Sequence, residues 1–229
     1  GGVSVAVTKT IHITRANAPP IVTLAATPLV YLENAAPLHV DGTATLADDS
    51  ASLEGGVLTV ELSANGQAED RLAIRHQGIG TGQIGIAEAS VTYQGAAIGS
   101  FSGGAGTTPL VVRFTGGATP IMAQALVRNL TYWNLSDNPV LLARIVQITL
   151  SDGNGATSLP KTRTIKITPI NDIPAMTLTP EPLHYTENEA PTVIDSAATV
   201  SDVDSPDFHL GRLTVVIGVN GHPDDRLGI

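Results

Sequence analysis

An internal repeat with a period of 154 residues is the feature that most constrains how this chain can fold. Three blocks occur twice and in the same order. They are 9–14 with 163–168, 31–37 with 185–191, and 65–72 with 220–227. The first two pairs are offset by 154 positions (165 − 11), and the third by 155 (220 − 65), which indicates one inserted residue. Self-similarity at a fixed period is typical of tandem structural repeats.

The repeat predicts three parts in this chain. Residues 1–20 are the last strand and linker of a preceding repeat, 21–174 form one complete repeat, and 175–229 are the opening part of the next. We place the boundary at 171–174, because a residue that precedes proline is held extended and a segment bracketed by prolines makes a short, stiff connector. The period fixes the length of the repeat but leaves its phase open.

The complete repeat shows the pattern of β-strands. Five segments rich in β-branched and apolar residues are predicted strands, and apolar residues alternate with polar ones in several of them. They are 29–32, 57–62, 91–93, 110–114 and 144–150. Asn65-Gly66 and the segment 152–155 are typical of hairpin turns. Thr119 followed by Pro120 predicts the start of a short helix. We therefore expect an all-β, cadherin/Ig-like β-sandwich with an inserted hairpin around 75–103 and one short helix.

The composition excludes several classes of protein. The net charge is −9, with 21 acidic residues against 12 Lys and Arg, so no basic face is available for nucleic acid or an anionic membrane. The chain contains no cysteine, which excludes disulfides, thiolate zinc sites and a cysteine nucleophile. Apolar runs are too short for a membrane span, so we expect no membrane insertion.

Oxygen-bearing side chains gather around the predicted boundary. Asp202 and Asp204 flank one residue in a segment that we predict to be extended, which would point both carboxylates to the same side. Together with Asn171 and Asp172 they could supply several of the hard oxygen ligands that Ca²⁺ takes. The alternative is that these Asp and Asn residues only form turns and solvated loops.

These motifs resemble the cadherin pattern, and more closely the cadherin-like tandem repeats of large bacterial surface proteins and adhesins. The resemblance rests on a Glu-Asn near the start of each repeat, Ser-Asp-Val-Asp at 201–204, Asp-Arg at 70–71, and Asn-Asp-x-Pro at 171–174. It implies Ca²⁺ bound between successive repeats. The implied ligands are Glu33, Asp70, Asn171, Asp172, Asp202 and Asp204 at one junction, Asp48 with Asn17 and Asp49 at the preceding one, and Glu187 with Asp225 at the following one.

The preceding junction has fewer predicted ligands. Ala18 stands at the position of Asp172, and Ser50 at the position of Asp204. We therefore expect weaker calcium binding around 17–49 than around 171–204.

The predicted function is a calcium-stiffened, extracellular stalk or adhesion repeat of a long bacterial surface or secreted protein, without enzymatic activity. Its expected partners are neighbouring repeats of the same chain and a cell-surface or matrix polysaccharide or protein. No metalloprotease or nucleophile-elbow motif is present, although an enzyme accessory domain stays open. The main alternative is a carbohydrate-binding module that uses the 75–103 hairpin or the pair Tyr132-Trp133, which could instead be an anchor of the core.

Overall fold

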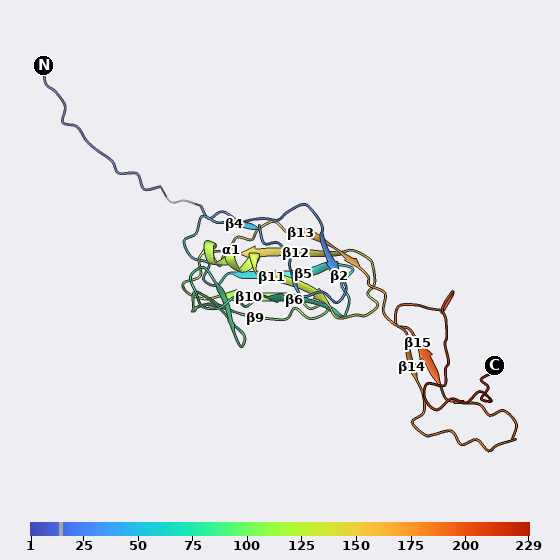
Figure 1. Cartoon of the computed structure of the whole chain (residues 1–229). Helices are drawn as coiled ribbons and strands as arrows, with labels where there is room; N and C mark the ends of the chain where they lie inside the picture. Colours follow the sequence, from blue (N-terminus) through green and yellow to red (C-terminus); the bar gives the residue numbers. More distant parts are fainter. Residues whose placement is uncertain (14–15) are drawn as a thin grey trace. The chain divides into compact units, whose positions relative to one another are not determined.

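The computed structural model describes residues 1–13 and 16–229 (Figure 1). Thr14, which ends the first copy of a repeated block, lies outside these residues together with Arg15. The chain divides into two compact units, Gly1–Pro169 and Ile170–Ile229. The division falls just before the predicted linker 171–174, and each unit is described here by itself.

The first unit contains one large sheet of eight strands. Its order is β2 (Leu29–Leu32), β13 (Lys161–Thr168), β12 (Arg144–Ser151), β5 (Val57–Ala64), β10 (Leu110–Phe114), β9 (Ala96–Ser102), β8 (Ser90–Tyr93) and β7 (Ile84–Ala87). Burial alternates along the whole of β12, as expected for a strand with one face in the core. β2 pairs in parallel with β13, and the other neighbours are antiparallel.

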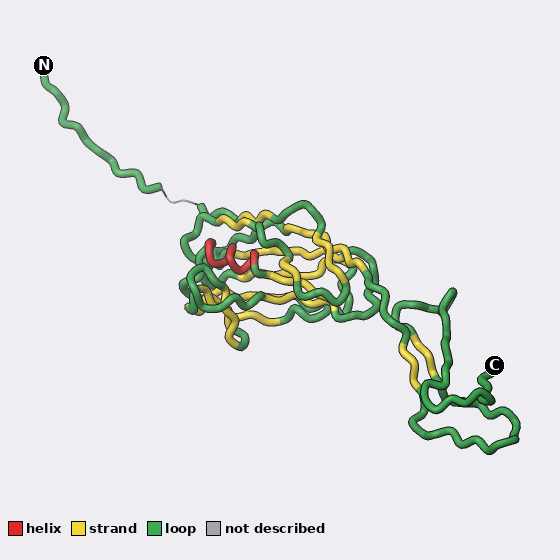
Figure 2. Tube along the Cα trace, in the orientation of Figure 1, coloured by secondary structure: helices red, strands yellow, loops and turns green. Residues whose placement is uncertain are grey.

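The second layer of this unit is made of two smaller sheets. One has the order β3 (Leu38–His39), β11 (Leu130–Asn134) and β6 (Asp70–Ile74), and the other pairs β1 (Ile21–Thr23) with β4 (Thr45–Ala47). The helix α1 (Pro120–Arg128) packs against β4 at one end of the unit (Figure 2). Within the described residues it is the only helix, so the predicted all-β sandwich with one short helix is confirmed.

The core lies between the two layers. Val60 of β5 and Ile148 of β12 are fully buried on the inner face of the large sheet. Tyr31 of β2 and Tyr132 of β11 meet edge to face across the layers, with 5.4 Å between the ring centroids. The layers are therefore joined by aromatic as well as aliphatic contacts.

Three local predictions need correction or refinement. The predicted hairpin at 75–103 is an antiparallel meander of three strands, β7 to β9, that widens the large sheet beyond β10. Asn65-Gly66 makes a turn, with Asn65 at φ 58°, but it joins strands of different sheets and is not a hairpin. Thr119 has the extended backbone of an N-cap, yet its side chain makes no cap hydrogen bond. Turn residues set the local bend, whereas the pairing of strands depends on the tertiary fold.

The second unit reproduces the opening of the first in detail. β14 (Ala175–Thr177) pairs with β15 (Thr199–Ser201), just as β1 pairs with β4. The pair Ala175↔Ser201 matches Ile21↔Ala47, and both positions are displaced by 154 (175 − 21 and 201 − 47). The tyrosine hydroxyls of Tyr31 and Tyr185 each donate to the carbonyl four residues later, both at 2.8 Å. The two sequence copies therefore adopt the same local structure.

A buried carboxylate couples the fold of the first unit to pH. Asp41 is 2% exposed and accepts hydrogen bonds from the Ala25 N–H (2.5 Å) and from the N–H (2.8 Å) and hydroxyl (2.7 Å) of Thr43. It also forms an ion pair with Arg163 at 3.4 Å. Burial raises the pKa of Asp41, but these hydrogen bonds and the nearby guanidinium outweigh it and lower the pKa below the ordinary 3.8.

We expect Asp41 to contribute stability that is lost in acid. Because its pKa is lower in the folded state, the contribution is present above pH 3.8 and disappears as the pH falls through the folded-state pKa. Urea unfolding at a series of pH values should show a shallower acid decline for Asp41→Asn than for the wild type. The exposed Asp137→Asn serves as a control and should keep the wild-type slope. Identical slopes for Asp41→Asn and the wild type would contradict this role.

Candidate metal site

Oxygen-bearing side chains of the first unit gather where the segment before β1 meets two loops. The Asn17 amide donates to Asp152 Oδ2 at 2.7 Å, and the Ser50 hydroxyl donates to Asn17 Oδ1 at 3.3 Å. The Asn154 amide donates to Ser50 Oγ at 3.1 Å. We call this group, with its neighbours, the linker cluster. Its members are Asn17, Asp48, Asp49, Ser50, Asp152 and Asn154.

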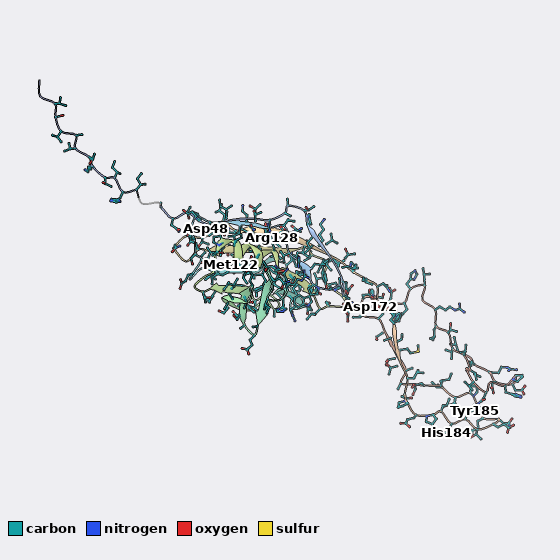
Figure 3. All side chains as sticks on the ribbon, turned by 60° about the vertical axis from the view of Figure 1, so that its left-hand side comes forward. Asp48, Met122, Arg128, Asp172, His184 and Tyr185 are labelled. Atoms are coloured by element: carbon teal, nitrogen blue, oxygen red, sulfur yellow. The ribbon has the colours of Figure 1, made fainter. Side chains whose placement is uncertain are left out.

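Helix α1 fixes the first of these loops. Arg128 Nε donates to the Ala44 carbonyl at 2.7 Å, and Gln124 Oε1 accepts from the Leu46 N–H at 3.1 Å. Both bonds tie the helix to the strand that leads directly into Asp48, and Figure 3 labels Asp48 and Arg128 on this part of the unit. The position of Asp48 is thus set by the packing of helix on strand.

One carboxylate oxygen of Asp48 has no hydrogen-bond partner among the described residues. Its Oδ1 accepts from the Ser50 N–H at 2.8 Å. Its Oδ2 is buried and, within the described part of the chain, has no hydrogen-bond partner. A buried carboxylate oxygen without a partner is costly, and a bound cation would remove that cost.

Asp152 and Asn154 are members of the cluster that the sequence analysis missed, and Asp152 carries the charge. Asp152 is fully buried, and its Oδ1 accepts from the N–H groups of Asn154 (2.7 Å) and Ala156 (3.1 Å). Burial raises its pKa, but the hydrogen bonds from Asn17, Asn154 and Ala156 outweigh burial and lower the pKa below 3.8, so the carboxylate stays ionised. The segment 152–155 was interpreted only as a turn, although the same Asp-Gly-Asn-Gly residues could have suggested an acidic loop.

A solvent-open groove of about 510 Å³ lies beside the linker cluster. It is lined by Ser50, Ala51, Ser52, Glu54 and Asn154. Ca²⁺ commonly combines protein oxygens with water molecules in a shell of six to eight ligands. The groove gives water and a hydrated cation access to the cluster.

In the second unit, the predicted extended segment at 202–204 is a bend. Asp202 Oδ1 accepts from the backbone N–H groups of Asp204 (3.3 Å) and Ser205 (3.0 Å), so the two carboxylates are brought together by a turn and not by strand alternation. The Asp172 N–H donates to Asp204 Oδ2 at 3.3 Å. The side-chain amide of Asn171 donates to the Asp172 carbonyl at 2.6 Å. Asp204 Oδ1 is buried and has no hydrogen-bond partner within 1–13 and 16–229.

A similar arrangement occurs in both copies, although the carboxylates that accept from the linker, Asp49 and Asp204, are not at equivalent positions of the repeat. In each, an aspartate oxygen accepts the N–H two residues later, from Ser50 in the first copy and from Asp204 in the second. The linker N–H at the matching positions, Ala18 and Asp172, donates to a carboxylate of that loop, in both cases at 3.3 Å. Each linker is thus held to the acidic loop of the repeat that it enters.

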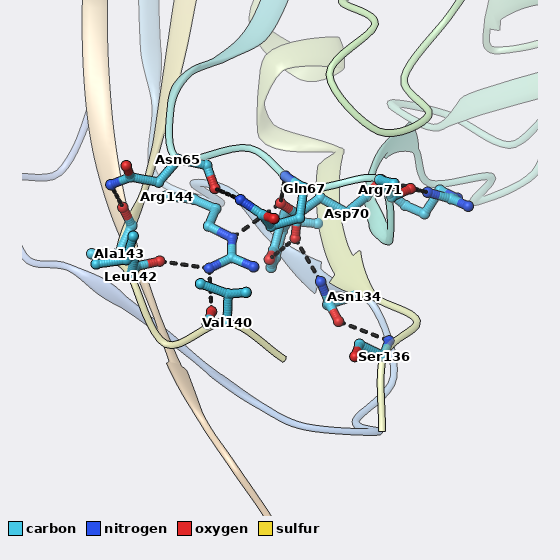
Figure 4. A network of polar contacts seen from close by, with 12 residues as sticks. Asn65, Gln67, Asp70, Arg71, Asn134, Ser136, Val140, Leu142, Ala143 and Arg144 are labelled. Atoms are coloured by element: carbon cyan, nitrogen blue, oxygen red, sulfur yellow. Dashed lines mark hydrogen bonds and ion pairs between the residues drawn. The ribbon is translucent and has the colours of Figure 1, made fainter. Parts of the chain in front are cut away.

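Asp70, which was predicted as a ligand of the junction that contains Asn171, lies in the core of the first unit. Its carboxylate accepts from the Tyr132 hydroxyl (2.6 Å), the Asn134 amide (2.7 Å), Arg144 Nε (3.0 Å) and the Gln67 N–H (2.8 Å) (Figure 4). Both oxygens are engaged by protein donors. We therefore leave Asp70 out of the ligand set proposed below.

The two predicted glutamate ligands were assigned to junctions other than the one that contains Asp48. Glu33 is 2% exposed and follows β2, and its N–H donates to the Thr168 carbonyl at 2.9 Å, where β13 ends. In Figure 1 the ends of β2 and β13 lie opposite the end that carries α1 and β4. Glu187 lies in an exposed turn that is closed by a hydrogen bond from Glu189 to Thr186. Glu33 was predicted for the junction that contains Asn171, and it lies at the end of the first unit where β13 leads into that linker. Glu187 was predicted for the following junction and belongs to the second unit.

Within residues 1–13 and 16–229, no three acidic or histidine side chains are grouped closely enough to form a metal centre by themselves. Amide, hydroxyl and water oxygens would have to complete any shell. The described part of the chain also has no helix with the length and apolarity needed to cross a bilayer. The chain matches no protein-family model and no curated protein sequence.

Proposed function

We propose that this protein is a calcium-stiffened β-sandwich repeat of an extracellular stalk, of the kind that builds long bacterial surface or secreted proteins. Ca²⁺ would bind at the linker cluster of the first unit and at the acidic loop around Asp204 in the second, and at each site it would hold the incoming linker against the loop. Its role is mechanical and non-enzymatic, and its immediate partners are the neighbouring repeats of the same chain.

One observation carries the proposal. The contact between linker and acidic loop forms in both copies, and each loop retains a buried carboxylate oxygen without a donor among the described residues, Oδ2 of Asp48 and Oδ1 of Asp204. Two carboxylates that approach to about 4 Å repel by about 4 kcal/mol at an effective dielectric constant of about 20. A divalent cation would turn this repulsion into attraction, and the net charge of −9 favours its approach.

Thermal unfolding with Ca²⁺ and with EDTA tests the function directly. Calcium that binds only the folded form must raise the unfolding midpoint, by the equivalent of about 2.7 kcal/mol at a concentration of about one hundred times Kd. Mg²⁺ should be less effective, because it demands a smaller and more regular octahedral shell. An unchanged midpoint, with no heat of calcium binding in titration calorimetry, would refute the proposal.

Variants of the two loops separate the sites. Asp152 and Asn154 add oxygens to the linker cluster. We expect Asp48→Ala to remove one calcium-binding step and Asp204→Ala the other, with the step around 171–204 the tighter of the two, as the sequence predicted. Asp137→Ala, which removes an equal but exposed charge, should leave both steps intact.

A further inference from the structure

The outward face of the sheet formed by β3, β11 and β6 differs in charge from the rest of the chain. The strand register places His39, Arg71, Ala73, Thr131 and Trp133 on this side of the sheet. Pro37 and Arg75, directly next to β3 and β6, line the groove on the same side. This set contains two arginines and a histidine and no acidic residue, although the chain as a whole carries a net charge of −9. The face is therefore an electropositive exception on an acidic protein.

The two adjacent aromatic residues of β11 have opposite roles. Tyr132 is fully buried, and its hydroxyl donates to Asp70. Trp133 points outward and is only partly buried. It lines a shallow groove of about 340 Å³. The other lining residues are Pro37, Ala73, Ile74, Arg75 and Thr131. Only Trp133 is thus available to meet a ligand.

Arg75 is held at the edge of this groove by His39. Arg75 Nη1 lies 3.1 Å from His39 Nε2. Burial and the nearby Arg75 lower the pKa of His39, which favours the neutral imidazole that can accept a hydrogen bond from the guanidinium. Within the described residues, no carboxylate forms an ion pair with Arg75. The remaining donors of the guanidinium can face an incoming anion in a bidentate geometry.

We propose that this groove binds a carboxylate-bearing sugar, a uronic acid unit of an acidic polysaccharide. The C–H face of the pyranose ring would stack on the indole of Trp133, whose face is electron-rich. The sugar carboxylate would pair with the guanidinium of Arg75. A groove that lies open along a sheet face can hold one unit of a long chain, whose flanking units extend into solvent. This binding goes beyond the calcium-dependent role proposed above and does not require it.

Titration calorimetry with a short oligogalacturonate tests the assignment. The titrations are carried out in EDTA, because uronates themselves bind Ca²⁺. Binding that is measured in EDTA is also independent of the two proposed calcium sites. Wild-type protein should bind oligogalacturonate and should bind its neutral methyl ester at least tenfold more weakly. Trp133→Ala and Arg75→Ala should each weaken binding at least tenfold, and Arg75→Lys should lie between Arg75→Ala and the wild type.

Two controls keep the result interpretable. Arg113→Ala removes an exposed arginine of the large sheet and should leave the affinity unchanged. Trp133→Leu preserves an apolar side chain, so its thermal unfolding midpoint shows whether the loss of binding reflects a loss of stacking or of folding. Equal affinity for the acidic and the neutral oligomer would overturn the proposal. So would the absence of binding at millimolar ligand, or tight binding of an acidic peptide in its place.

Discussion

Replacing Asp70 by alanine should lower the free energy of unfolding by about 3–5 kcal/mol, because it leaves a buried guanidinium without its counterion. Arg144 and Asp70 are both 0% exposed, and the Nε–Oδ2 distance is 3.0 Å. Arg144 comes from β12 of the large sheet and Asp70 from β6 of the small one, so their ion pair joins the two layers.

The surrounding network makes the loss larger than that of one ion pair. Arg144 Nη1 donates to the carbonyls of Val140 and Leu142, the latter at 2.6 Å, which ties the segment before β12 to the core (Figure 4). Tyr132 donates to the same carboxylate, and burial together with the negative charge of Asp70 raises the pKa of this tyrosine far above 10. Tyr132 therefore stays protonated, and removal of Asp70 also deprives its hydroxyl of an acceptor.

Chemical denaturation of Asp70→Ala, Arg144→Met and the double variant Asp70→Leu/Arg144→Met measures the effect. Each single variant leaves one buried charge or donor unpaired, whereas the double variant replaces the pair by apolar side chains of similar size. We expect the double variant to recover much of the lost stability, as buried ion pairs often allow. A small loss for Asp70→Ala, below about 1 kcal/mol, would show that the pair is not desolvated as the structure has it.

Replacing Gly153 by alanine should destabilise the first unit by roughly 2–5 kcal/mol and weaken calcium binding at the linker cluster at least tenfold. Gly153 has φ +81°, a left-handed conformation that costs other residues about 1–2 kcal/mol. A Cβ atom at this position would lie 2.1 Å from the Glu54 carbonyl oxygen. The loop would have to move, and it carries Asp152 and Asn154 on either side of the glycine.

Gly155→Ala is the matched control in the same loop. Gly155 also has a positive φ, of 100°, but a Cβ there meets no atom within 4 Å. Gly155→Ala should therefore lose only the stability that the left-handed backbone conformation costs an alanine. Its calcium affinity should stay close to the wild-type value. Denaturant unfolding in EDTA separates the effect on stability from the effect on calcium, which titration calorimetry then measures. Equal behaviour of the two variants would rule out the close approach at Gly153.

Much of the fold could be predicted from local patterns, and most of the candidate site could not. The strands at 57–62 and 144–150 and the helix that begins at Pro120 were recognisable from periodicity and capping signals. The contact between Asn17 and Asp152 joins residues that are 135 positions apart. No local pattern encodes such a contact, because it depends on how β12 and the linker are placed by the rest of the sandwich.

The turn that ends at Asp70 was determined by the local sequence, because its second copy, which ends at Asp225, forms the same hydrogen bonds. The Asp70 N–H donates to the Gln67 carbonyl at 3.2 Å, and the Asp225 N–H donates to the His222 carbonyl at 3.0 Å. In both turns an oxygen of the aspartate side chain accepts the N–H three residues earlier, at 2.8 and 2.6 Å. The sequence determines this turn because its hydrogen bonds span only three residues and need no other strand.

The burial of Asp70 depends on strands that lie far from it in the sequence. Asp70 is fully buried, because β11 and β12 bring Tyr132, Asn134 and Arg144 onto its carboxylate from more than sixty positions away. Motif and charge alone made Asp70 resemble a calcium ligand. Only the tertiary structure, which supplies the desolvation and the guanidinium, makes it the anchor between two sheets.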